Sequence, residues 1–235
     1  RRGEEAIRES ECARELEPLC AAVNSSAAAW VRFLAGDYDT AITLSRESAE
    51  MEPRYVAARR VLAAAYLQAG RGSEAVATLE EALNALGGDP MVIAALAHAA
   101  AVMGNRNRAV ALLDGLHDAA GPRRPSSYDL GLVYAGLGDV NAAFAALDRA
   151  VDDADPALIY LAADPRLQPL GSDSRYSLLR GRLGLQEPSA RPSRLAARSA
   201  RDQHIRFCTT ADGQRIAYSV IGAGPVDVRV LGHFT

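Results

Sequence analysis

Four glycines of this chain recur at one fixed interval. They are separated by 34 residues each time, and an alanine follows five positions after each of them; the glycines are Gly36, Gly70, Gly104 and Gly138, and the alanines are Ala41, Ala75, Ala109 and Ala143. A repeat with a period of about 20 to 50 residues indicates a stack of like supersecondary units. We therefore expect four like units to stack side by side between residues 22 and 157, each burying its apolar surface against its neighbours.

A small residue recurs at a second position of each unit, at Ala29, Ala63, Ala97 and Gly131. Leucine comes directly before it at Leu62, Leu96 and Leu130, and tyrosine comes three residues after it at Tyr66 and Tyr134. Small side chains let two antiparallel helices approach closely, and the leucines and tyrosines fill the space beside the crossing. Glycine at the first set of positions suits the left-handed residue that ends the first helix of each pair.

This arrangement resembles the tetratricopeptide-repeat pattern, in which leucine, a small residue, tyrosine and glycine mark a first helix, and alanine, a large apolar residue and alanine mark a second. The second-helix positions are occupied by Leu79, Leu113, Leu147, Ala82 and Ala150. The resemblance implies a mainly α fold, a right-handed α-solenoid of helix-turn-helix repeats over residues 22–55, 56–89, 90–123 and 124–157. The first and third units depart from the pattern at Arg32, Ser45, Ser48, Ala100 and the Gly-Pro-Arg-Arg-Pro run at 121–125.

Segments on both sides of the repeats extend the predicted solenoid domain to residues 1–185. Residues 1–21 resemble a partial repeat whose first helix is missing, which indicates a piece of a longer protein. Residues 158–185 resemble the closing segment found after tetratricopeptide arrays in bacterial multidomain signalling proteins. We expect this segment to cap the solenoid with a more polar end.

The C-terminal part of the chain differs in composition and in period. Residues 186–203 are rich in Pro, Ser, Ala and Arg, which predicts a linker. Residues 204–210 and 214–221 alternate in the manner of strands around an Asp-Gly turn, which predicts a β-hairpin. A third strand is expected at residues 226–231.

The segment 204–235 resembles the N-terminus of an α/β-hydrolase domain, most clearly in the run from Ile205 to Tyr218. The resemblance is to the opening hairpin of such domains, particularly those fused to bacterial adenylate or guanylate cyclases. No G-x-S-x-G nucleophile elbow occurs in the sequence, so the catalytic set of that family is absent. We therefore expect no enzymatic activity from this chain.

Composition excludes several kinds of chemistry and partner. All 26 basic residues are arginine, which excludes a Walker-type phosphate loop or a Schiff-base lysine, and suggests a bacterial source. The net charge of -3 gives no electrostatic reason to expect nucleic acid or an anionic membrane as partner. The three cysteines lack CxxC spacing and the four histidines lack metal-ligand spacing, so we expect no metal and no other cofactor. A reducing cytoplasm fits best, and the longest apolar stretch, residues 91–103, is too short to cross a bilayer.

The concave groove of the predicted solenoid is the candidate binding surface. The resemblance places seven first-helix residues on its lining: Trp30, Phe33, Arg60, Leu67, Gln68, His98 and Tyr128. Aromatic and arginine side chains often dominate the binding energy at protein interfaces. The alternatives are that Trp30 and Phe33 only pack under the incomplete N-terminal repeat, and that His98 is a partly buried, hydrogen-bonded residue without a special role.

These observations favour a protein-protein interaction scaffold, a regulatory module of a larger bacterial signalling protein. Its expected partner is a peptide, or a neighbouring domain of the same protein, in the concave groove. One alternative is the front part of an α/β-hydrolase or nucleotide-cyclase-linked enzyme whose catalytic residues lie outside this chain. Another is a transcription-regulatory scaffold with its DNA-binding domain upstream, although nothing in the chain supports DNA contact.

Overall fold

A computed structural model describes residues 2–16, 20–118, 125–185, 204–209 and 215–220. The chain divides into two compact units, Arg1–Leu185 and Gln186–Thr235. Helices make up the described part of the first unit, and two strands make up that of the second. The expected linker at 186–203 and the expected third strand at 226–231 lie outside the described residues.

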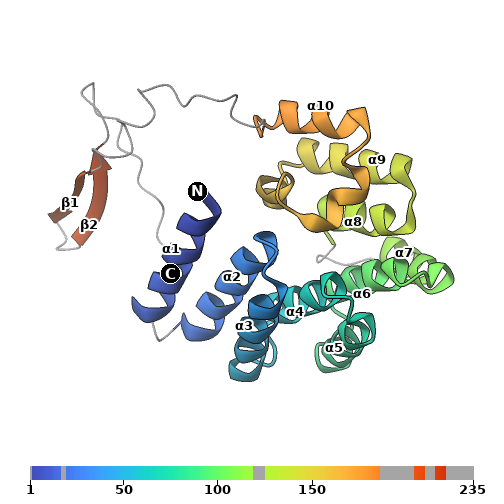
Figure 1. The fold of residues 1–235 in the computed structure, drawn as a ribbon, viewed down its shortest axis with the longest axis horizontal. Coiled ribbons are helices and arrows are strands. Elements are labelled where there is room, and N and C mark those ends of the chain that lie inside the picture. Colours follow the sequence, from blue (N-terminus) through green and yellow to red (C-terminus); the bar gives the residue numbers. More distant parts are fainter. Residues whose placement is uncertain (1, 17–19, 119–124, 186–203, 210–214, 221–235) are drawn as a thin grey trace. The chain divides into compact units, whose positions relative to one another are not determined.

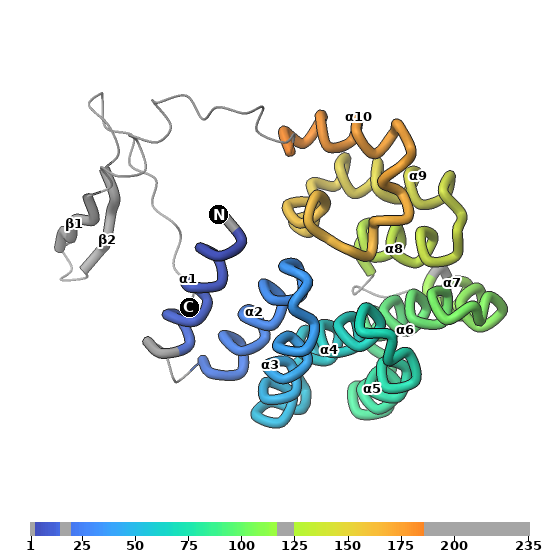
Figure 2. The backbone as a smooth tube through the Cα atoms, in the orientation of Figure 1, coloured from blue at the N-terminus to red at the C-terminus, as the bar shows by residue number. Residues whose placement is uncertain are grey.

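The first unit is a solenoid of helix pairs, as its sequence period predicts (Figure 1). Its pairs are α2 (Ala21–Leu34) with α3 (Tyr38–Met51), α4 (Val56–Gln68) with α5 (Gly72–Ala85), α6 (Pro90–Val102) with α7 (Arg106–Asp118), and α8 (Ser127–Leu137) with α9 (Val140–Asp152). The first helices α2, α4, α6 and α8 also contact one another in that order, which makes them an inner layer (Figure 2). The second helices lie along the outside of this layer.

The four repeating glycines end the four inner helices. Gly36, Gly70, Gly104 and Gly138 have φ values of 82°, 74°, 78° and 73°. The residue after each glycine donates its backbone N–H to a carbonyl five residues earlier, at 2.8–3.0 Å. This is the Schellman arrangement, and it satisfies carbonyls that the end of a helix leaves without a partner. The fixed interval in the sequence is therefore an interval between left-handed helix ends.

Repeating small residues lie where the two helices of each pair cross. Ala41, Ala75, Ala109 and Ala143 are fully buried. At Gly131 an added Cβ atom would lie 3.1 Å from the Leu147 side chain, so the helices α8 and α9 meet closely there. The buried leucines at the neighbouring repeat position, Leu79, Leu113 and Leu147, belong to the hydrophobic core. Small residues permit close approach, and large ones fill the remaining space.

Two short 3₁₀ helices and a final α-helix follow the fourth pair. They are η2 (Pro156–Tyr160), η3 (Pro165–Leu170) and α10 (Ser174–Arg182). We call residues 156–171, which contain η2 and η3, the return segment. Its leucines are buried in one cluster with α8 and α9: Leu158, Leu161, Leu167 and Leu170. The return segment thus covers apolar surface that a fifth repeat would otherwise bury.

Helix α1 (Arg2–Leu16) packs against α2 at the beginning of the solenoid. Two ion pairs fasten it, one between Glu11 and Arg32 and one between Arg14 and Glu47 at 3.1 Å. Arg32, which replaces the usual tyrosine of the repeat pattern, therefore binds the helix before it. Ser48, another departure, is fully buried and donates to the Ala22 carbonyl at 2.6 Å.

The second unit contains strands β1 (His204–Thr209) and β2 (Arg215–Val220). They pair antiparallel, with His204 opposite Val220 and Thr209 opposite Arg215. The five residues between the two strands, which include the expected Asp-Gly turn, lie outside the described residues.

Candidate functional site

The inner face of the solenoid is covered by residues of its own chain. The return segment lies against this face, because η3 packs on α8 and Arg166 reaches the rings of Trp30 and Phe33 on α2. Side chains from the first helix pair and from the return segment therefore meet on the inner face. Trp30 and Arg166 are far apart in sequence, and the curvature of the helix stack brings them together.

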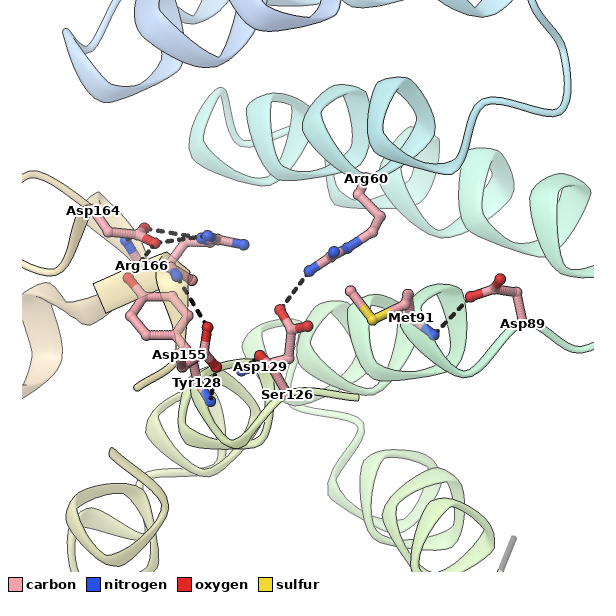
Figure 3. A network of polar contacts seen from close by, with 10 residues as sticks. Arg60, Asp89, Met91, Ser126, Tyr128, Asp129, Asp155, Asp164 and Arg166 are labelled. Atoms are coloured by element: carbon pink, nitrogen blue, oxygen red, sulfur yellow. Dashed lines mark hydrogen bonds and ion pairs between the residues drawn. The ribbon is translucent and has the colours of Figure 1, made fainter. Parts of the chain in front are cut away.

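A buried ion pair lies at the centre of this meeting point (Figure 3). Arg166 donates to Asp164 from Nε at 2.9 Å and from Nη2 at 2.6 Å, and Tyr128 donates its hydroxyl to the same carboxylate at 2.9 Å. The Asp164 side chain is fully buried. Burial alone would raise the pKa of Asp164, but the Arg166 charge and these hydrogen bonds lower it below its ordinary value. The carboxylate is therefore ionised and fully paired.

Two neighbours of the ion pair are held in their neutral forms. Burial, followed by the nearby Asp164 charge, raises the pKa of the Tyr128 hydroxyl. Burial, followed by the Arg166 charge, lowers the pKa of His98 to about 3. His98 is therefore a neutral imidazole at physiological pH, and it carries no charge that could attract an anionic ligand.

Trp30 lies between three other side chains. Its ring stacks on Phe33 with a centroid distance of 5.1 Å and meets the Tyr160 ring edge-on at 5.3 Å. The Arg166 guanidinium lies 5.2 Å from the Trp30 centroid and 5.7 Å from that of Phe33. Edge-on ring pairs and cations above ring faces are both attractive arrangements. These contacts join α2 to the return segment.

A second ion pair crosses the inner face from α4 to α8. Arg60 donates to Asp129, whose carboxylate lies in the first turn of α8 and is almost buried. Ser126 caps the same helix by accepting the backbone N–H of Asp129. Arg60 pairs with Asp129 and keeps about a quarter of its side chain exposed (24%).

A pocket of about 480 Å³ opens beside these contacts, between α2, α4, α8 and the return segment. We call it the seam pocket. Its aromatic and charged lining residues are Trp30, Tyr55, Tyr128, Tyr160, Arg60, Asp129 and Arg166. Trp30 Nε1 is buried and has no hydrogen-bond partner among the described residues. An unpaired buried donor is unfavourable, so this nitrogen lowers the stability of the folded chain.

The seven predicted groove residues occupy different environments in the structure. Phe33, His98 and Tyr128 are buried beneath the return segment or beside it. Trp30 and Arg60 are half-buried and line the seam pocket. Leu67 and Gln68 are half-buried near the end of α4, and Leu67 lines a much smaller hollow together with Arg60 and His98. A direct role of any of the seven in binding stays a prediction.

Sequence reasoning missed four residues that the structure brings to this site: Asp129, Tyr160, Asp164 and Arg166. A partial signal was present, because Asp164-Pro165-Arg166 and Asp173-Ser174-Arg175 share an Asp-x-Arg spacing. In both, the aspartate accepts the backbone N–H two residues later, at 3.0 and 2.9 Å. The spacing therefore predicts a helix cap, but it does not say that only the first motif is buried on the inner face.

In the described parts of the chain, the His, Cys, Asp and Glu residues form no group of three or more that could hold a metal ion. None of the described helices combines the length and apolar character needed to cross a membrane.

Comparison with known proteins places part of the chain in a repeat family. No curated protein matches it significantly. A crystal structure of a tetratricopeptide repeat protein from Parabacteroides merdae matches 80% of this chain and 75% of its own, at 11% identity and a TM-score of 0.43. The family model described as tetratricopeptide repeat matches residues 32–99, from the end of α2 into α6, and no part of 204–235. Residues 32–99 are thus similar to tetratricopeptide repeats.

Proposed function

We propose that residues 1–185 are a protein-interaction scaffold that binds a peptide segment of a partner protein at the seam pocket. We further propose that this scaffold is a regulatory, non-catalytic part of a larger bacterial signalling protein. The observation that carries the proposal is the combination in one pocket of aromatic rings and a partly exposed arginine.

The size and chemistry of the seam pocket support a peptide as its ligand. About 480 Å³ lies within the usual range for ligand pockets, roughly 300 to 1,000 Å³. Trp30, Tyr55 and Tyr160 offer ring surface to apolar side chains, and aromatic and arginine residues are the commonest energetic centres of interfaces. The guanidinium of Arg60 is a donor only, so it suits the carbonyl and carboxylate oxygens of a peptide.

The experiment selects peptides from a random displayed library on the full chain and measures their affinity by fluorescence anisotropy. Trp30→Ala and Arg60→Ala should each weaken the selected peptides about tenfold or more, equivalent to about 1.4 kcal/mol. Arg59→Ala is the matched control, because Arg59 is the neighbouring residue on α4 and pairs with Glu81 of α5. The selected peptides should bind the Arg59→Ala variant as tightly as they bind the unaltered chain.

Circular dichroism must accompany these measurements, because loss of Arg60 leaves the Asp129 carboxylate without its cation. Selected peptides that bind folded Trp30→Ala and Arg60→Ala variants as tightly as the unaltered chain would contradict the proposed site. Weakening by Arg59→Ala to the same degree would contradict it as well.

A further inference from the structure

We propose that Trp30, Tyr160 and Arg166 form a latch, which holds the first helix pair against the return segment and must open before a partner reaches the part of the inner face that Arg166 covers. The latch itself is independent of any partner, and only its gating role rests on the function proposed above. Three ring and cation contacts make it, at 5.3 Å between Trp30 and Tyr160 and at 5.2 and 5.7 Å from Arg166 to the rings of Trp30 and Phe33.

The two sides of the latch are attached very differently to the rest of the unit. The return segment is anchored by Leu161, Leu167 and Leu170, which are fully buried against α8 and α9. Arg166 is fixed on the same side by its ion pair with Asp164. The first helix pair is connected to the rest of the stack through α4. Opening therefore separates α2 from the return segment and leaves the leucine cluster intact.

Two open pockets lie between the first helix pair and the return segment. One is the seam pocket of about 480 Å³. The other, of about 400 Å³, is lined by Leu34 and Tyr38 of the first helix pair and by Ala162 and Gln168 of the return segment. Neither η2 nor η3 packs its backbone extensively on α2. The contact between α2 and the return segment is therefore narrow, and few contacts are lost when it separates.

Arg166 covers part of the inner face. Phe33 packs in the core with Ile42 and Leu62 and is fully buried, and His98 is almost so. Arg166 lies over the Phe33 ring and its charge acts on His98. A partner that contacts the Phe33 ring from the inner face must first displace the guanidinium. In the closed state the seam pocket stays open to a partner, and opening extends the binding surface across α2.

Trp30 provides a direct measure of the latch because it is the only tryptophan of the chain. Tyr160→Ala in the full chain removes the edge-on ring. We expect the Trp30 emission maximum to move to longer wavelength and its acrylamide quenching constant to roughly double as the open population grows. Ile159→Ala is the matched control, since Ile159 is the adjacent residue of η2 and its side chain is mostly exposed (67%). This control should leave emission and quenching unchanged.

A second variant covers the case in which Tyr160→Ala fails to fold. Arg166→Lys keeps a cation for Asp164 but removes the planar guanidinium from the rings of Trp30 and Phe33, so it should also increase quenching of Trp30. Either variant with unchanged helical circular dichroism and unchanged Trp30 quenching would overturn the latch. These readings need no partner, so their failure is distinct from failure of peptide binding.

The gating role is tested by stopped-flow mixing with the selected peptides. If opening limits access, the observed association rate of the unaltered chain should level off as the peptide concentration rises, since only the open fraction of molecules is competent to complete binding. An observed rate that keeps rising linearly with peptide concentration would overturn the gating role.

Discussion

Arg166 donates two hydrogen bonds to the carboxylate of Asp164 in a place where that carboxylate has no exposure to solvent. Arg175 makes the same two bonds to Asp173, at 3.0 and 2.8 Å. In that second pair, 43% of the arginine side chain and 27% of the aspartate side chain remain exposed. The same Asp-x-Arg motif is thus present once in a buried place and once in a partly exposed place. A comparison of the two pairs separates the effect of burial on stability from the effect of hydrogen-bond geometry.

Loss of the buried arginine should be far more damaging than loss of the exposed one. Arg166→Gln leaves Asp164 as an unpaired buried charge, and we expect the free energy of unfolding to fall by about 3 to 5 kcal/mol. Arg175→Gln leaves a carboxylate that water can solvate, so its effect should be small. Urea denaturation followed by circular dichroism measures both. Equal losses for the two variants would mean that burial does not decide the contribution of this motif.

The depressed pKa of His98 makes stability depend on pH. Its pKa is about 3 in the folded chain and 6.5 ordinarily, so between these values the unfolded chain binds a proton that the folded chain does not. Stability from this residue is complete above pH 6.5 and falls with decreasing pH by about 1.4 kcal/mol per unit. Asp164, whose folded pKa is also lowered, adds to the loss only at more acidic pH.

His98→Leu should remove this dependence, because leucine does not titrate. The free energy of unfolding of the unaltered chain should therefore fall from pH 7 to pH 5 relative to that of the variant. The variant thus gains stability relative to the unaltered chain as the pH decreases. Urea denaturation at each pH supplies the measurement. Parallel curves for the two proteins over this range would contradict a neutral, buried His98.

Local features of this fold were readable from the sequence because each has a local physical cause. Gly104 and its three counterparts are required by left-handed helix ends, and the period of these ends is the period of the repeat. The buried alanines follow from the distance between paired helices. The departures from the pattern have tertiary causes instead, since Ser48 of α3 donates to a backbone carbonyl of α2 and Arg32 of α2 pairs with Glu11 of α1.

The closed inner face could not be read from the sequence in the same way. Trp30 and Tyr160 meet because small rotations accumulate over four helix pairs, and no local pattern specifies that sum. The Asp-Pro-Arg motif predicts a cap but not the rings that its arginine will meet. The aromatic residues of α2 were therefore identified as groove residues without the partners that cover them.

The left-handed glycines can be tested against a glycine in an ordinary helix. An added Cβ atom has open space at both Gly104 and Gly115, but only Gly104 has a positive φ, of 78°. Gly104→Ala should lower the free energy of unfolding by about 1 to 2 kcal/mol through backbone strain alone. Gly115→Ala, within α7, should raise it by about 0.5 to 1 kcal/mol through helix propensity. Thermal or urea denaturation measures the free energy of unfolding of both variants. If the two substitutions changed it in the same direction, this account of the repeat would be contradicted.

The small residue at the helix crossing can be tested by enlarging it. Ala97 is fully buried beside Leu113 and Val133, so Ala97→Leu forces additional volume into a packed contact and should cost about 1 to 3 kcal/mol. Ala111→Leu adds the same atoms to an exposed position of α7, where it should change stability little. Urea denaturation compares the two. If Ala97→Leu were as stable as the unaltered chain, close approach of the helices would not be the reason for a small residue at this position of the repeat.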